Sequence, residues 1–167
     1  MSRAPAPPPA TALVVGIGNE YRSDDGAGLL VARRVRAAGL GRVEVREEGG
    51  DVGDLLASWS RSDSVFLVDS VRSDSSPGTI YRFDARAAQL PSIFVPHVSS
   101  HSVGLAEAVE LAQALDELPP RLIVYAIEGA DFSSGTRLSA AVQAAIPAVA
   151  ERLIGELGAL VTSGERS

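Results

Sequence analysis

Three short, almost wholly apolar runs constrain the fold of this chain more than any other feature of its sequence. They lie at 12–18, 64–70 and 121–127, and their continuity indicates strands buried on both faces of a sheet. Segments with apolar residues at helical spacing begin near 24 and 103. Strands that alternate with helices form mainly parallel sheets with right-handed crossovers. We therefore predict an α/β fold, a single-domain three-layer sandwich in which a mainly parallel twisted sheet of about five strands has helices on both faces.

Weaker patterns predict the remaining elements and the limits of the domain. The expected elements are a strand at 42–47, a short helix at 51–59, an edge strand at 78–83, a loop over most of 84–100 and a last helix at 139–157 that Pro147 bends. Four prolines among the first ten residues indicate a disordered leader at 1–10. The folded domain is thus expected at 11–160, followed by a flexible tail at 161–167.

Composition excludes several functional classes. The chain has no cysteine, so it has no disulfide framework, no thiolate metal site and no cysteine nucleophile. A net charge of -6 and the lack of a Lys/Arg cluster near aromatic residues argue against a nucleic-acid partner. The sequence shows no signal peptide and no uninterrupted run of about 18 apolar residues. We therefore expect a cytoplasmic protein that has no membrane partner.

The stretch "GIGNEYRSDDGAG", at 16–28, begins like a dinucleotide-binding turn but does not complete one. Tyr21 stands where that fingerprint needs its third glycine, and Asp24 and Asp25 occupy the helix N-terminus where a phosphate would bind. Two carboxylates there repel an anion, which disfavours nucleotide binding. The pair either caps the helix or binds a cation, because adjacent like charges raise each other's pKa unless something offsets them.

A third acid and two histidines lie where such a fold binds its ligands, beyond the carboxyl ends of the strands. Asp69 directly follows the apolar residues 65–68, and His97 and His101 precede the helix expected near 103. Each has a simpler interpretation as a turn-forming aspartate or an ordinary loop histidine. Two carboxylates and an imidazole together suit a borderline divalent ion such as zinc or nickel and leave positions for water or substrate. The G-x-S-x-G elbow of a serine hydrolase is absent from the sequence.

Five motifs of this chain resemble, in order, those of the hydrogenase maturation endopeptidases. They are "GIGNEYRSDDGAG", "EEGGD" at 47–51, "VFLVDSV" at 65–71, "SSHSVGL" at 99–105 and "IEGADFSSGTRLS" at 127–139. The resemblance implies a cytoplasmic α/β protein that removes a short C-terminal extension from the precursor of the nickel-iron hydrogenase large subunit, after nickel insertion. It also implies that nickel in the precursor is the recognition signal, and that zinc or cadmium can substitute in vitro.

The resemblance also assigns roles to individual residues. By motif, the family's catalytic and metal-contacting residues fall on Asp25, Asp69 and His101, whereas His97 has no counterpart and is expected to be ancillary. The residues expected to contact substrate are Asn19, Asp24, Glu48, Gly49 and Gly50. For the two glycines, a plain turn after the second strand is the alternative.

Departures from the family pattern bear on substrate choice. Many members have Glu where this chain has Asp25, which is one methylene shorter and requires a closer approach of the backbone. Glu48 and Asp51 stand where Asp and Thr are common. The segment 132–138 is interpreted either as a mobile loop that gates the site or as a plain connection.

The resulting hypothesis is peptide-bond hydrolysis at the tail of the precursor. The cation polarises the scissile carbonyl, lowers the pKa of an attacking water or only positions the tail, and Asp69 or Asp25 is the candidate general base. Two alternatives remain open. One is a hydrolase of a small amide or ester with its own resident metal, and the other is a nickel chaperone or docking protein that cuts nothing.

Overall fold

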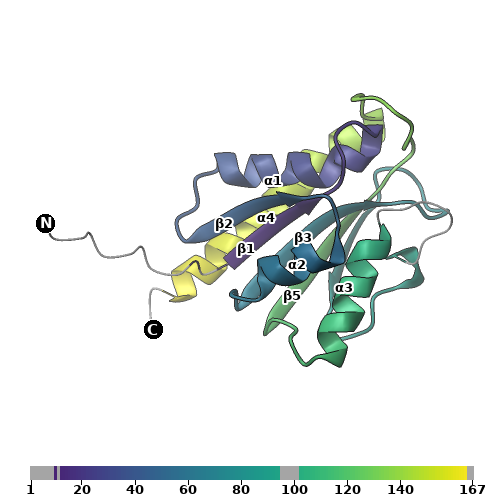
Figure 1. Cartoon of the computed structure of the whole chain (residues 1–167). Coiled ribbons are helices and arrows are strands. Elements are labelled where there is room, and N and C mark those ends of the chain that lie inside the picture. The colour runs from purple at the N-terminus through teal and green to yellow at the C-terminus, as the bar shows by residue number, and fades with distance from the viewer. Residues whose placement is uncertain (1–9, 11, 95–101, 165–167) are drawn as a thin grey trace, which may run out of the picture.

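Five strands form one sheet at the centre of the molecule. The fold is taken from a computed structural model, which describes residues 10, 12–94 and 102–164 (Figure 1). The strand order is β2-β1-β3-β5-β4, and all neighbours are parallel except β4, which runs antiparallel to β5 at one edge. The strands are β1 (Ala12–Ile17), β2 (Val43–Glu48), β3 (Ser64–Val71), β4 (Ile80–Asp84) and β5 (Arg121–Glu128).

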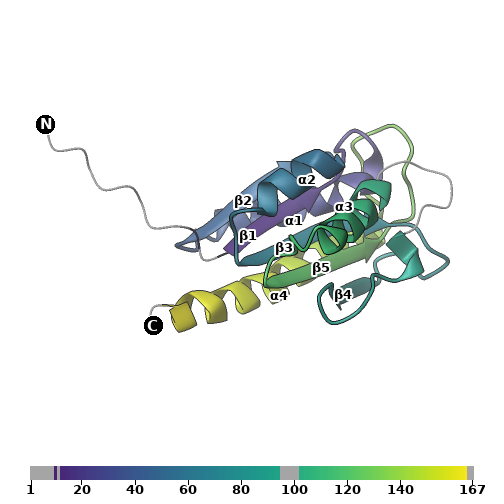
Figure 2. The ribbon, with the colours of Figure 1, turned by 60° about the horizontal axis from the view of Figure 1, so that its bottom comes forward.

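Helices cover both faces of this sheet, which confirms the predicted three-layer α/β architecture (Figure 2). On one face lie α1 (Ala27–Ala37), which follows the 3₁₀ turn η1 (Ser23–Gly26), and α4 (Ala140–Gly164). On the other face lie α2 (Val52–Trp59) and α3 (Ser102–Ala114), which follows the 3₁₀ turn η2 (Ser92–Phe94) after a gap in the described residues. None of the helices in the described ranges is long and apolar enough to cross a membrane.

The apolar runs are continuous because the central strands supply two separate cores. In β3, Phe66 and Val68 pack toward α1 and α4, while Val65 and Leu67 pack toward α2 and α3. Successive strand residues point to opposite faces, so a strand covered on both sides has no position for a polar side chain until it ends. Asp69 is an acid that stands near the carboxyl end of β3, still within its buried part.

The last helix is longer than the pattern predicts. The expected helix stops at 157, whereas α4 continues to Gly164, and the hydroxyls of Thr162 and Ser163 donate to the carbonyls of Gly158 and Ala159. Leu160 also packs against the core, which favours the extra turns. The predicted start of the flexible tail at 161 is therefore too early, because 161–164 are helical.

Glycines let α1 approach the sheet more closely than side chains would permit. A Cβ added at Gly28 would lie 2.3 Å from the carbonyl oxygen of Val68 in β3 and 2.4 Å from that of Ile17 in β1. A Cβ at Gly16 would lie 2.4 Å from the carbonyl oxygen of Gly28. The glycines of the first motif thus bring the start of α1, and the acids just before it, against the ends of β1 and β3.

We predict that Gly28→Ala lowers the free energy of unfolding by about 2–3 kcal/mol, because backbone atoms of two strands must move to admit the methyl group. Urea unfolding measures this change. Gly155→Ala is the control, since a Cβ there meets nothing within 4 Å and alanine favours the helix interior. Equal effects of the two substitutions would contradict the close-approach interpretation.

Candidate functional site

The acids predicted for the site lie at the end of the sheet where the parallel strands finish. Asp25 is in η1, which follows β1. Asp69 lies near the carboxyl end of β3, two residues before its last residue, Val71. The connection from β5 to α4 and the start of α1 meet at this same end (Figure 1). This is the edge at which open parallel sheets bind ligands.

Ser70 connects Asp25 and Asp69. Its backbone N–H donates to Asp69 Oδ1 at 2.8 Å, and its Oγ donates to Asp25 Oδ1 at 3.3 Å. All three residues are buried, with exposed fractions of 2% for Asp25, 0% for Asp69 and 3% for Ser70. The structure thus places two carboxylates in one buried cluster, although they are 44 positions apart in the sequence.

The environment of Asp69 disfavours its ionised form. Burial raises its pKa well above the ordinary value, the nearby Asp25 raises it further, and the hydrogen bond from Ser70 N–H opposes both effects. Among the residues that the structure describes, no donor reaches Asp69 Oδ2. A buried carboxylate oxygen in this state favours a proton or a cation. The cluster therefore fits a positively charged ligand on chemical grounds.

The backbone of Asp25 is in close contact with the backbone of Gly18. A Cβ at Gly18 would lie 1.9 Å from the Asp25 carbonyl oxygen, and Gly18 has a φ of +146°, which favours glycine. The N–H of Asn19 donates to that same oxygen at 3.3 Å. These contacts fix the backbone of η1 against the residues that follow β1.

The predicted third ligand, His101, lies outside the described residues, as does His97. Within the described ranges, no group of three or more His, Asp or Glu side chains is placed to hold a metal ion. The structure therefore brings together two of the three predicted ligands, Asp25 and Asp69, and metal binding by all three stays a prediction. The residue after His101 begins α3, and this start is held against Gly50, since a Cβ at Gly104 would lie 1.6 Å from the Gly50 carbonyl oxygen.

Three of the predicted substrate residues lie at the end of β2 and in the turn that leads to α2. Glu48 is half-buried and accepts from Ser58 Oγ at 2.8 Å. Gly49 is exposed, and Gly50 is buried with a φ of +92°. Asp51, at a position where the family pattern differs, caps α2 by accepting from Asp54 N–H. This geometry describes a glycine turn beside α3, and its contact with substrate stays a prediction.

Asp24 is used to hold a loop. Its exposed fraction is 0%, and its carboxylate accepts from three backbone N–H groups, those of Ala130 at 2.8 Å, Asp131 at 2.9 Å and Ser139 at 2.7 Å. These bonds occupy both oxygens. The predicted contact of Asp24 with substrate is not tested by the structure, whose hydrogen bonds favour a supporting role instead.

The same loop has further ties to the segment before η1. Ser23 Oγ donates to the Ser133 carbonyl at 2.9 Å, and Ser23 N–H donates to the Gly135 carbonyl at 2.8 Å. In return, Gly135 N–H donates to the Tyr21 carbonyl at 2.9 Å. These contacts favour the interpretation of 132–138 as a fixed connection. Asn19, also expected to contact substrate, is half-buried and accepts from Tyr21 N–H at 2.9 Å within this turn.

Sequence reasoning missed two residues at this edge. Ser70 gives no signal except that it follows Asp69. Glu128 has the same signal as Asp69, because it ends an apolar strand, and it is almost wholly buried. Its two oxygens accept from the N–H and Oγ of Ser73 at 2.6 and 2.8 Å, which fixes the connection that leaves β3.

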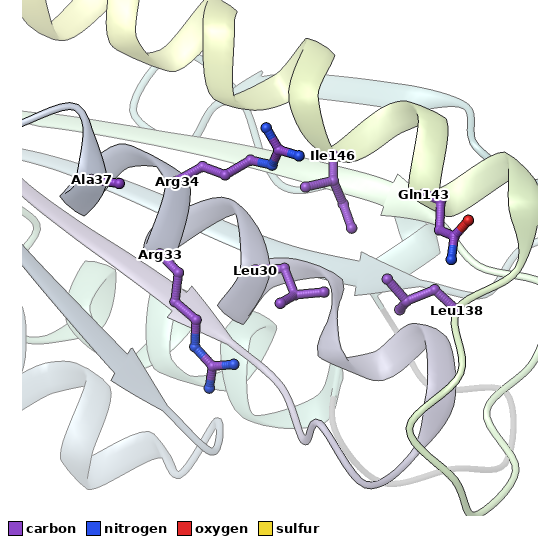
Figure 3. Close-up of a pocket in the computed structure, with 7 residues that line it drawn as sticks. All are labelled: Leu30, Arg33, Arg34, Ala37, Leu138, Gln143 and Ile146. Atoms are coloured by element: carbon purple, nitrogen blue, oxygen red, sulfur yellow. The ribbon is translucent and has the colours of Figure 1, made fainter.

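A groove of about 490 Å³ lies between α1 and α4 (Figure 3). Leu30, Leu138 and Ile146 face this groove, and Arg33 and Arg34 border it. Its described lining contains no acid or histidine. It therefore does not match the acidic cluster in chemistry.

We predict that Asp24→Asn lowers the free energy of unfolding by about 1.5–3 kcal/mol, because an amide cannot accept at both oxygens of the lost carboxylate. Hydrogen exchange should also speed up at the amides of Ala130, Asp131 and Ser139. Asp63→Asn, at an exposed position, is the control. Unchanged exchange in these three amides would contradict the anchoring role.

Asp69→Asn should stabilise the fold at high pH. Because the folded-state pKa of Asp69 is raised above the unfolded value, the stability gained by protonation is present at low pH and is lost as pH rises through the folded-state pKa. An asparagine side chain does not ionise, so the variant does not lose this stability as pH rises. Urea unfolding at pH 8 should therefore show the variant to be more stable than the parent, with a smaller excess at pH 5. An excess that is the same at both pH values would contradict the raised pKa.

Comparison with known proteins places this arrangement in a family. The family model described as hydrogenase maturation protease matches residues 31–156. The hydrogenase 2 maturation protease of Escherichia coli (strain K12) is 24% identical over 148 residues, which cover 87% of this chain and 89% of the relative.

Solved structures agree with this match. The hydrogenase maturating endopeptidase HybD from E. coli is 25% identical with a TM-score of 0.74, and the alignment covers 92% of this chain and 93% of HybD. The [NiFe] hydrogenase maturation protease HybD from Thermococcus kodakarensis is 25% identical with a TM-score of 0.65, covering 85% of this chain and 95% of that one. Because the family model spans most of the chain and the fold agrees, this protein is a peptidase that belongs to the hydrogenase maturation protease family.

Proposed function

We propose that this protein is a cytoplasmic endopeptidase that removes the C-terminal extension of a nickel-iron hydrogenase large-subunit precursor after nickel insertion. Nickel held by the precursor is the part of the substrate that it recognises. The observation that supports this proposal most directly is Asp69 Oδ2, a buried carboxylate oxygen that no donor in the described part of the chain reaches. Family membership supports the maturation step.

Electrostatics explains why a loaded precursor would be preferred. Asp25 and Asp69 are buried in one cluster, and their mutual repulsion raises the free energy of the doubly ionised state. A precursor that presents nickel supplies the positive charge that offsets this repulsion. A precursor without nickel leaves this repulsion in place and binds weakly. The preference for nickel-loaded over nickel-free precursor therefore arises from charge at the binding step.

The chain's own residues hold and orient this contact. Ser70 fixes one oxygen of each carboxylate, which leaves Asp69 Oδ2 directed to a ligand. His101 is the third contact in this proposal. Docking nickel against the carboxylates releases any proton that burial keeps on Asp69, because metal and proton compete for the same oxygen.

Hydrolysis follows from the position of the tail. Nickel docked at this edge holds the adjoining peptide of the precursor beside the carboxylates, so that the scissile bond meets an ordered water. Asp69 or Asp25 is the candidate general base that accepts the proton of that water. The chain contains no cysteine that could act as an alternative nucleophile.

We predict that the purified protein shortens nickel-loaded precursor and leaves nickel-free precursor intact, with intact-mass spectrometry as the measurement. Asp69→Asn and His101→Ala should each lower the rate by at least about 100-fold while circular dichroism stays unchanged. His97→Ala is the matched control and should process normally. Normal processing by both site variants, or equal cleavage of both precursors, would overturn the assignment.

A further inference from the structure

A hollow of about 470 Å³ opens beyond the end of β3, the strand that carries Asp69. It is bordered by Arg72, Ser73 and Asp74 in the connection after β3, and by Ser92 and Ile93 in η2. Arg72 is three residues after Asp69, which corresponds to about 10 Å along an extended strand. An extended peptide covers this distance in about three residues. A substrate tail held at Asp69 therefore reaches Arg72 if it runs through the hollow.

The side chain of Arg72 has a defined support. Its guanidinium carbon lies 5.7 Å from the centroid of the Phe132 ring, in the range of a cation–π contact. Phe132 is itself packed closely, since a Cβ at Gly129 would lie 2.5 Å from the ring. The loop that contains Phe132 is anchored by the buried Asp24. The guanidinium is thus oriented by a fixed aromatic ring.

The backbone next to Arg72 is held by a second contact. Glu128 is 1% exposed, and both of its oxygens accept hydrogen bonds from Ser73, one from the N–H and one from Oγ. Fixing the backbone at one end and the ring at the other reduces the entropy that Arg72 loses when it binds a ligand.

Arg72 has a carboxylate near it, that of Asp131, whose pKa is lowered by hydrogen bonds from Ser133 and, after them, by the charge of Arg72. Within the described part of the chain Arg72 forms no ion pair, whereas Arg33, Arg36 and Arg82 are each paired with a glutamate. The nearby Asp131 is exposed, and its Oδ1 already accepts from the N–H and Oγ of Ser133. A guanidinium with free donors and a fixed plane is suited to a carboxylate.

From this arrangement we infer that Arg72 is a specificity-determining residue, which binds a carboxylate on the C-terminal segment of the precursor while the nickel contacts Asp25 and Asp69. The inference rests on the proposed function and adds a second point of recognition to it. The carboxylate is either an acidic side chain of that segment or its terminal carboxylate. Both sources present the same group to Arg72.

Binding by itself tests this inference without any cleavage. In an NMR titration with a synthetic peptide copy of the precursor's C-terminal segment, the Arg72 Nε–Hε signal should shift, and the Arg61 signal should not. Arg61 is an exposed arginine that precedes β3 at the other end of the strand. Peptides with amidated acidic side chains or an amidated terminus distinguish the two sources, because only the relevant amide abolishes the shift. An Arg72 Nε–Hε signal that does not shift with any of the peptides would overturn the inference.

Kinetics on nickel-loaded precursor supplies the second readout. Arg72→Ala should raise KM roughly tenfold with kcat within about twofold, as expected for the loss of one charge-assisted pair. Arg72→Lys should recover part of the loss, and Arg61→Ala should match the parent. A fall in kcat with KM unchanged would contradict a binding role. Arg72-dependent peptide binding without any cleavage of loaded precursor would refute the proposed function but not the inference about Arg72.

Discussion

Asp25 and Asp69 are held together through Ser70 at the ends of neighbouring strands, where water cannot screen the repulsion between their charges. This arrangement exists because α1 starts unusually close to the sheet. Glycines at 16, 18 and 28 remove the side chains that would keep η1 away from β1 and β3. The strained pair is therefore a product of close backbone packing, and a cation brought by a substrate would relieve its strain.

The other two buried acids at this edge differ from Asp69, because hydrogen bonds reach both of their carboxylate oxygens. Asp24 and Glu128 each have both oxygens hydrogen-bonded to loop residues, so their charges are compensated within the fold. They hold the connections on either side of the site, after β5 and after β3. A buried carboxylate with an oxygen that no donor reaches, as in Asp69, is suited to a ligand, whereas Asp24 and Glu128 fix loops. Hydrogen bonding distinguishes them where burial does not.

Much of the fold follows from local patterns, but the supporting contacts do not. The apolar runs predict β1, β3 and β5, and their continuity predicts helices on both faces, as the structure confirms. The rule that ligands lie beyond parallel strand ends also singles out Asp69. The roles of Asp24 and Ser70 depend on partners distant in sequence, Ser139 and Asp25, which no local pattern encodes. Glu128 has the same strand-end signal as Asp69, and only its contact with Ser73 separates their roles.

The central claim, that Asp25 and Asp69 jointly accept a cation, is tested most directly by a crystal of the protein soaked with zinc as a substitute for nickel. Anomalous scattering locates the metal without reference to activity. The account predicts one site with carboxylate oxygens of both Asp25 and Asp69 at about 2.0–2.2 Å, which Asp69→Asn abolishes. Zinc bound elsewhere, with neither carboxylate in contact, would contradict it.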